Sequence, residues 1–173
     1  MDNLKAIIEA LIFVSGTPIT SSRIVGIMED VKEMEVSSAI DDLVREYEER
    51  NGGIFLRDVA GGYQFRTGET VGSWVHKLKG QKPAALSPAA METLAVVAYR
   101  QPVMRSEIEK VRGVDISGTL RGLLEKNLVR IVGRKDVPGR PMIYGTTRKF
   151  LETFGLKTLS DLPTLREFRE LGE

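Results

Sequence analysis

The sequence offers few of the residue types that carry out catalysis. Cysteine is absent and His76 is the single histidine, so disulfides, thiolate metal sites and histidine-based triads lack the residues they require. The carboxylate pairs Asp41-Asp42 and Glu48-Glu49 lie in an expected helix, where adjacent side chains point in different directions and do not converge on one substrate. The glycine-rich segments match neither the phosphate-loop nor the dinucleotide-binding spacing. We therefore predict no catalytic, metal or cofactor site, and a protein that is not an enzyme.

Charge is distributed unevenly along the chain. Residues 1–86 contain 10 Lys and Arg against 13 Asp and Glu, a net charge of −3. Residues 87–150 contain 12 against 6, a net charge of +6, and residues 151–173 contain 3 against 5, a net charge of −2. A polyanion or an acidic protein segment is therefore expected to be attracted to residues 87–150.

The first part of the chain is expected to form three helices and a β-hairpin. An amphipathic helix near the N-terminus has apolar residues at helical spacing. Thr20 is expected to cap a second helix, and a third covers residues 35–50. Strands 54–59 and 63–67 follow, and then a short helix over 70–78 that carries Trp74, a core or interface anchor. The apolar residues of the first helix are Leu4, Ile7, Ile8, Leu11 and Ile12, and Phe13 and Val14 widen their face.

The same order of elements is expected in residues 87–156. Ser87 and Pro88 favour a helix start, a second helix follows Pro102, and Asp115 is expected to cap a third. Strands 128–134 and 142–146 then flank a loop in which Pro138-Gly139 suits a type II turn.

The repeated order predicts an α+β, mainly helical protein with tandem winged helix-turn-helix domains, each with three helices and a β-hairpin wing. Residues 18–24 align with residues 102–108 at an offset of 84, which favours a structural duplication. The expected domains are 1–79 and 87–156. A linker over 80–86 joins them, and a C-terminal tail covers 157–173, with a helix expected to begin at Pro163.

Winged helices often bind DNA, but the expected recognition helices are poorly suited to it. The helix over 35–50 has six acidic residues against two arginines, and phosphates would repel it. The corresponding helix in the second domain has Arg121 among small residues, which favour close approach of another backbone over base recognition. In the wing, Arg134, Lys135 and Arg140 either contact phosphates or remain solvated beside a turn that the prolines shape.

The N-terminal segment is a poor match to a signal peptide, because Asp2 precedes Lys5 and Glu9 interrupts the apolar run. No stretch is long enough to span a bilayer. A cytoplasmic protein without a membrane partner is therefore expected.

The sequence resembles the bacterial segregation and condensation protein B family over nearly its whole length. The most specific motif is GRKDVPGRP at residues 133–141. Further motifs are LSPAAMETL at 86–94, AYRQPV at 98–103, RGVD at 112–115, YGTT at 144–147 before Phe150-Leu151, and GGYQFRT at 61–67. One departure is Met104, where the family tends to have a capping threonine.

This resemblance implies a non-catalytic subunit of the bacterial condensin complex. It implies a homodimer that binds the kleisin subunit, segregation and condensation protein A, and through it the SMC ATPase, with DNA contacted indirectly or weakly and nucleoid association. The alternative is a winged-helix DNA-binding or transcription-regulatory protein. The predicted kleisin-binding residues are Arg100, Arg121, Arg134, Lys135, Arg140 and Tyr144. The predicted dimer interface consists of Ile7, Ile8, Leu11, Ile12 and Val14.

Overall fold

The computed structural model describes residues 3–28, 30–80, 85–164 and 167. The chain forms two compact units. The first unit comprises residues 1–83 together with 155–173, and the second comprises residues 84–154. The expected linker falls largely on residues 81–84, which lie outside the described residues, as does most of the helix expected from Pro163.

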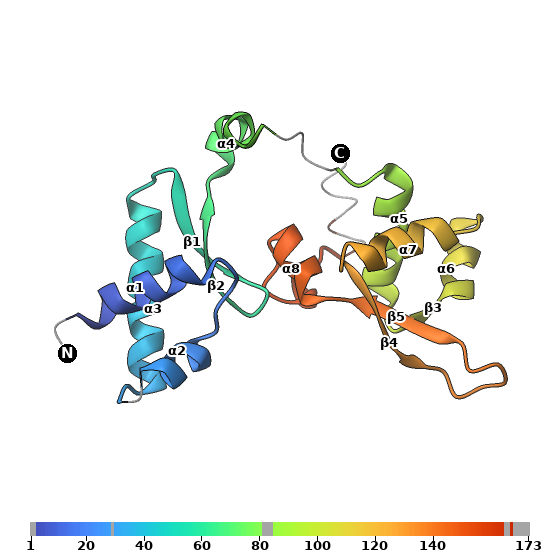
Figure 1. Cartoon of the computed structure of the whole chain (residues 1–173), viewed down its shortest axis with the longest axis horizontal. Helices are drawn as coiled ribbons and strands as arrows, with labels where there is room; N and C mark the ends of the chain where they lie inside the picture. The colour runs from blue at the N-terminus through green and yellow to red at the C-terminus, as the bar shows by residue number, and fades with distance from the viewer. Residues whose placement is uncertain (1–2, 29, 81–84, 165–166, 168–173) are drawn as a thin grey trace. The chain divides into compact units, whose positions relative to one another are not determined.

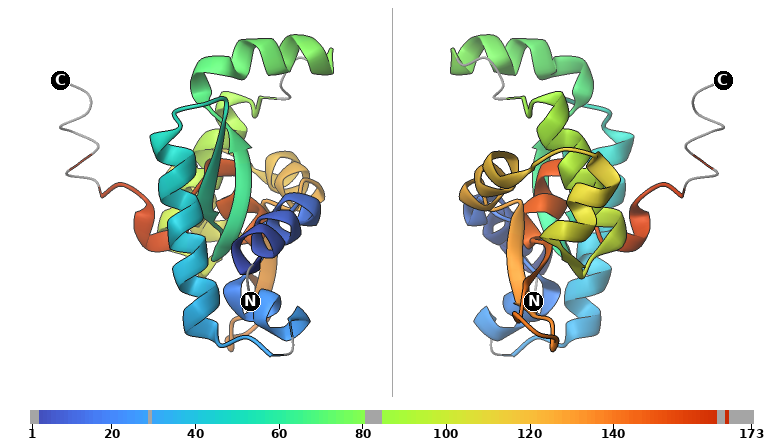
Figure 2. Two further views of the ribbon diagram at one scale, coloured as in Figure 1. Left: turned by 90° about the vertical axis from the view of Figure 1, so that its left-hand side faces the viewer. Right: turned by 90° about the vertical axis from the view of Figure 1, so that its right-hand side faces the viewer.

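The first unit consists of helices around a two-stranded hairpin (Figure 1). Helix α1 contacts α3 and the hairpin, and the hairpin lies alongside α3 (Figure 2, left). The antiparallel strands pair with Ile54 opposite Thr67 and Val59 opposite Gly62. Its elements are α1 (Leu4–Ser15), α2 (Ser21–Ile27), α3 (Glu33–Glu49), β1 (Ile54–Val59), β2 (Gly62–Thr67), η1 (Glu69–Val71) and α4 (Gly72–Lys79), with η2 (Leu159–Asp161) from the C-terminal segment.

Apolar side chains from α1, α2, α3 and β1 form the core of the first unit. Ile8, Ile24 and Ile40 are fully buried, with Leu43 and Leu56 beside them. In α1 the buried Ile8 and Ile12, and in α3 the buried Ile40 and Leu43, recur at helical spacing and lie on the inner faces of their helices. The cap predicted for α2 is confirmed: the Thr20 hydroxyl accepts a hydrogen bond from the Arg23 amide at 3.1 Å.

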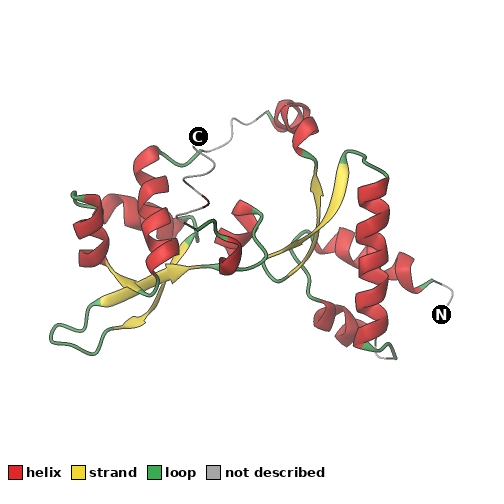
Figure 3. Ribbon diagram, turned by 180° about the vertical axis from the view of Figure 1, so that it is seen from behind, coloured by secondary structure: helices red, strands yellow, loops and turns green. Residues whose placement is uncertain are grey.

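The second unit has four helices and a small three-stranded sheet in the order β3-β5-β4 (Figure 3). The Ser87 hydroxyl accepts a hydrogen bond from the Ala90 amide at 3.3 Å, so the predicted start of α5 is confirmed. Leu94, Val97, Ile108 and Leu123 are among its buried residues. Its elements are α5 (Pro88–Arg100), β3 (Val103–Met104), α6 (Arg105–Arg112), α7 (Ser117–Glu125), β4 (Val129–Arg134), β5 (Met142–Thr146) and α8 (Arg148–Phe154).

Both units attach a short extended segment to the second strand of their hairpin. Ile19 forms an isolated antiparallel bridge with Tyr63, and Val103 pairs antiparallel with Tyr144. In each unit this segment lies directly before the helix that follows a proline. The predicted alignment of residues 18–24 with 102–108 therefore joins positions that have the same pairing.

The C-terminal segment after α8 belongs to the first unit. The Leu156 carbonyl accepts a hydrogen bond from the Ala60 amide at 2.8 Å, and Lys157 Nζ lies 2.6 Å from Asp58 Oδ2. The sequence-based boundary assigned Leu156 to the second domain and Lys157 to a tail. The structure differs because these bonds attach the segment to the β1–β2 turn.

Candidate partner-binding surfaces

The loop between β4 and β5 presents the cations predicted to bind a partner. It extends away from the helices of its unit (Figure 1), and Arg134, Lys135 and Arg140 are exposed. The predicted type II turn is confirmed, because the Arg140 amide donates to the Val137 carbonyl at 2.8 Å and Gly139 has a φ of 84°.

Backbone contacts hold this loop in a defined shape. The Lys135 amide donates to the Pro141 carbonyl at 2.9 Å, and Arg134 Nη1 donates to the Arg140 carbonyl at 3.2 Å. Lys135 Nζ lies 4.0 Å from Glu107 Oε1 on α6, and both side chains are about half exposed. The loop therefore presents positive charge from a fixed backbone, which reduces the entropy lost when a partner binds.

The other residues predicted to bind the kleisin are placed differently. Arg100 is exposed at the end of α5, and Arg121 on α7 forms an ion pair with Glu125 at 2.9 Å. Tyr144 is only 8% exposed, and its hydroxyl lies 3.8 Å from Met142 Sδ. Because its side chain is buried, Tyr144 adds little to an exposed surface.

Helix α7 has a surface that permits close approach, as its small residues predict. A Cβ atom added at Gly118 or Gly122 would meet nothing within 4 Å. These glycines line a shallow cavity of about 210 Å³ together with Leu86, Ala90 and Lys126. At the start of the helix, the Asp115 carboxylate accepts bonds from the hydroxyl and amide of Ser117, which lower the pKa of Asp115.

The predicted dimer face on α1 divides into buried and exposed residues. Ile8 and Ile12 are buried in the core of the first unit, and Leu11 packs against that core. Ile7 and Val14 are exposed, Val14 by 80%. Because Ile8 and Ile12 face inward, the surface that α1 offers to a partner is narrower than the predicted set.

Phe13 extends the exposed surface of α1 and was missing from the predicted interface. It is 71% exposed and contacts Phe65 edge-on, with ring centroids 6.4 Å apart. Phe13 lines a cavity of about 260 Å³ with Tyr47 and Ile54. The Tyr47 hydroxyl donates to Glu9 at 2.5 Å, and this hydrogen bond raises the pKa of Tyr47. The over-wide apolar face of α1 was the sequence signal for this surface.

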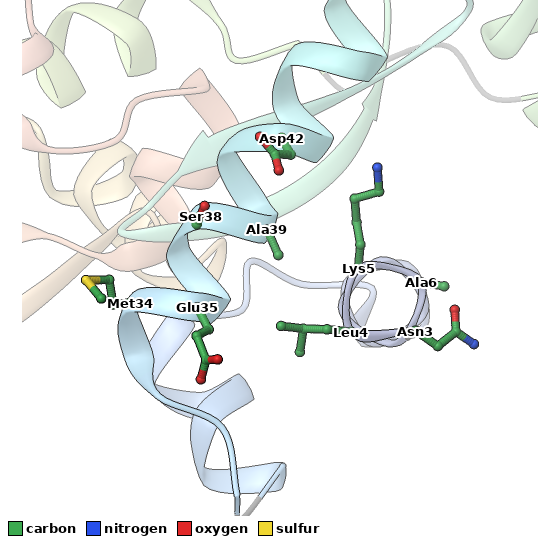
Figure 4. Close-up of a pocket in the computed structure, with 9 residues that line it drawn as sticks. All are labelled: Asn3, Leu4, Lys5, Ala6, Met34, Glu35, Ser38, Ala39 and Asp42. Carbon is green, nitrogen blue, oxygen red and sulfur yellow. The ribbon is translucent and has the colours of Figure 1, made fainter. Parts of the chain in front are cut away.

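A larger groove of about 820 Å³ lies between the first turn of α1 and the N-terminal half of α3 (Figure 4). Leu4 points toward α3, and Lys5 extends toward the side of the groove where Asp42 lies. Met34 and Ala39 add apolar surface, and Glu35 adds a carboxylate.

Neither a metal site nor a membrane-spanning helix is found among the described residues. No group of three or more His, Cys, Asp and Glu side chains is placed to hold a metal ion within the described part of the chain. In the same residues, no helix combines the length and apolar character needed to cross a membrane.

Comparison with known proteins identifies the family. Residues 6–165 match the family described as segregation and condensation complex subunit ScpB. This chain belongs to the ScpB family. Segregation and condensation protein B of Syntrophotalea carbinolica is 49% identical over 168 residues, which cover 97% of this chain and 85% of that protein.

Two solved structures of similar sequence are also ScpB proteins. A crystal structure of ScpB from Mycobacterium tuberculosis is 36% identical, covers 90% of this chain and 96% of that one, and has a TM-score of 0.42. A second, a dimer of the ScpB N-terminal domain complexed with ScpA peptide, is 29% identical, covers 44% of this chain and 95% of that one, and has a TM-score of 0.41. The resemblance to ScpB found in the sequence motifs is confirmed by the family match.

One further exposed surface of this ScpB chain lies outside the predicted set. Trp74 and Leu78 on α4 are exposed, although Trp74 was expected to be a core or interface anchor. A helical spacing of four residues between two apolar side chains was the available signal. Exposure excludes the core, so the interface interpretation of Trp74 remains as a prediction.

Proposed function

We propose that this ScpB chain is a non-catalytic adaptor of the bacterial SMC condensin complex. It forms a homodimer through the first unit and binds the kleisin subunit through the second. The kleisin links it to the SMC ATPase, and DNA is contacted indirectly or weakly. In this role it acts at the nucleoid and supports chromosome condensation and segregation during cell division.

We also infer that each unit is a winged-helix domain. The first unit has α1, α2 and α3 before its hairpin, and the second has α5, α6 and α7 before its own. The matching pairs Ile19–Tyr63 and Val103–Tyr144 support a duplicated fold. We take residues 1–79 and 87–154 as the two domains, with the segment after α8 attached to the first.

The observation that carries the kleisin proposal is the exposed, backbone-fixed cation cluster at Arg134, Lys135 and Arg140 in the unit with a net charge of +6 over residues 87–150. Positive charge on a rigid loop favours binding of an acidic, partly disordered partner segment. Electrostatic complementarity raises the association rate and selects the partner.

The charge-reversed loop tests this proposal. Arg134→Glu, Lys135→Glu and Arg140→Glu together are expected to weaken binding of the purified kleisin by at least about tenfold in calorimetry. The thermal unfolding midpoint should stay unchanged, because the three side chains are exposed. A matched control reverses Lys110, Arg130 and Lys149, which changes the charge of the second unit equally but lies outside the loop. Unchanged kleisin affinity in the loop variant would contradict the proposal.

The same three cations favour one alternative, a winged-helix protein that binds DNA through its second wing. Three phosphate contacts give a slope of about −2.7 for the logarithm of the binding constant against the logarithm of salt concentration. Kleisin binding through a partly apolar interface is expected to depend less on salt. If DNA binding has this slope and no kleisin is bound at any salt concentration, the DNA-binding function replaces the adaptor function.

A further inference from the structure

Helix α4 presents an apolar face that the first unit does not cover. Trp74 is 68% exposed and Leu78 is 87% exposed. The two residues are four positions apart and therefore lie on one side of the helix. The element on which α4 packs extensively is η1, the short turn directly before it. Large apolar side chains gathered on one exposed helix face indicate a contact surface for a partner.

The charge on α4 defines the chemistry of that partner. Lys77 and Lys79 lie in the last turns of the helix, and Lys77 Nζ lies 4.7 Å from the centroid of the Trp74 ring. The exposed apolar face is therefore flanked by cations. A surface that is complementary to it combines an apolar floor with carboxylates.

The groove between α1 and α3 has this combination. Leu4, Met34 and Ala39 provide apolar lining. Glu35 and Asp42 provide two carboxylates against one cation of the lining, Lys5, which pairs with Glu46 on α3. Helix α3 as a whole has seven acidic residues and one arginine. The groove has a volume of about 820 Å³, which lies within the range of ligand-binding pockets, so it can accept bulky side chains.

The groove and α4 lie at different ends of the same unit. Helix α4 is beyond the C-terminal end of α3 in both orientations of the first unit, whereas the groove is at the N-terminal half of α3 (Figures 1 and 2). Helix α4 therefore does not fill the groove of its own chain, and a second copy of the chain can supply it. Ala6 lines both this groove and the cavity beside Phe13, so the groove is continuous with the exposed apolar surface of α1.

We propose that α4 of one protomer docks in the α1–α3 groove of a second copy. Trp74 and Leu78 enter the apolar lining, and Lys77 faces the carboxylates at its edge. Two such contacts related by a two-fold axis form an isologous dimer in which each copy gives one helix and receives one. This inference rests on the proposed function, of which dimerisation through the first unit is a part.

The single tryptophan of the chain provides a direct readout. Its fluorescence reports on α4 without interference from any other tryptophan. In a dilution series followed by light scattering, dimer formation is expected to shift the emission maximum to shorter wavelength and to protect Trp74 from a soluble quencher. Both changes should follow the dimer fraction. A dimer in which the emission of Trp74 is the same as in the monomer would overturn the docking of α4, while the proposed dimerisation would stand.

Complementation between two variants tests the exchange itself. Leu78→Glu damages the helix and leaves the groove intact, whereas Met34→Glu damages the groove and leaves the helix intact. Each variant alone is expected to weaken dimerisation by at least about tenfold. Mixing them should restore part of the association, because the mixed pair has one intact helix in one intact groove. Ile27→Glu, at an exposed apolar residue of α2 outside the groove, is the matched control and should not change dimerisation.

Three other outcomes would contradict the docking of α4 in the groove. If mixing restores nothing, or if Trp74 emission shifts only when kleisin or DNA is added, another partner covers α4 and the inference is wrong. If the wild-type chain stays monomeric at every concentration, both this inference and the proposed dimerisation fail. Circular dichroism of each variant confirms that loss of association does not come from loss of fold.

Discussion

Lys157 Nζ lies 2.6 Å from Asp58 Oδ2, and this ion pair attaches the segment after α8 to the end of β1. The adjacent hydrogen bond from the Ala60 amide to the Leu156 carbonyl reinforces the attachment at 2.8 Å. The polypeptide therefore leaves the first unit after α4 and returns to it after α8. Both ends of the second unit are continuous with segments that belong to the first.

The Lys157–Asp58 pair predicts a dependence of stability on alkaline pH. The hydrogen bond to Asp58 raises the pKa of Lys157 above its ordinary value of 10.5. The contribution of the pair is therefore full below the unfolded-state pKa and is lost as the pH rises through the higher folded-state pKa. Lys157→Met is expected to lower the thermal unfolding midpoint slightly at neutral pH, because Lys157 is exposed. The difference from wild type should disappear above the pKa of Lys157.

Asp58→Asn provides the control for this pair. It should lower the midpoint as Lys157→Met does, and the double variant should show no additional loss, since the two residues form one interaction. Additive losses, or a difference from wild type that persists at the most alkaline pH, would show that Lys157 acts through some other contact.

Local sequence patterns predicted most helices and strands but not this attachment. Thr20, Ser87 and Pro138-Gly139 determine caps and a turn within a few residues, and the structure has each of them. The bond between Lys157 and Asp58 joins residues far apart in the chain, and no local spacing indicates it. Tertiary packing decides such contacts.

The candidate surfaces could also be predicted only in part, because local sequence patterns do not show which side chains tertiary packing buries. Helical spacing identified the apolar face of α1, but every residue on it is apolar, so composition does not separate the buried Ile8 from the exposed Ile7. Tyrosine is a residue type that is common at interfaces, yet Tyr144 pairs with Val103 and is buried inside the second unit. The loop cations, in contrast, flank a turn at Pro138-Gly139 that the sequence specifies locally.

Helix α6 lacks the side-chain cap that α2 has, and restoring it should stabilise the second unit. Met104 is the N-cap of α6 and forms no side-chain cap bond, whereas Glu107 accepts its amide at 2.8 Å. Met104→Thr is expected to add about 1 kcal/mol of unfolding free energy, because a hydroxyl accepts a bond from an otherwise unpaired helix amide. Urea denaturation measures the difference. Met104→Val has nearly the same shape without the hydroxyl, and a gain equal to that of threonine would show that capping is not the cause.

Two apolar residues on α1 should differ sharply in their effect on stability. Ile12 is buried in the core of the first unit, so Ile12→Ala is expected to cost about 2–5 kcal/mol of unfolding free energy. Val14 is exposed, so Val14→Ala should change stability by less than about 0.5 kcal/mol. Denaturation is measured at protein concentrations low enough to keep both variants monomeric. Equal losses would mean that Val14 is covered within the monomer.

Gly62 lies where β2 meets the extended segment before α2, and this contact leaves no room for a side chain. A Cβ atom at Gly62 would lie 2.8 Å from the Ile19 carbonyl oxygen and 2.9 Å from its carbon, both of which are backbone atoms. Gly62→Ala is therefore expected to displace Ile19 from its bridge to Tyr63 and to cost about 1–3 kcal/mol of unfolding free energy. Gly26→Ala is the matched control, because its Cβ would meet nothing within 4 Å inside α2. The control should gain about 0.5–1 kcal/mol from helix propensity. Thermal denaturation of both variants compares them, and a Gly62→Ala protein as stable as wild type would show that the Ile19 segment is free to move away from β2.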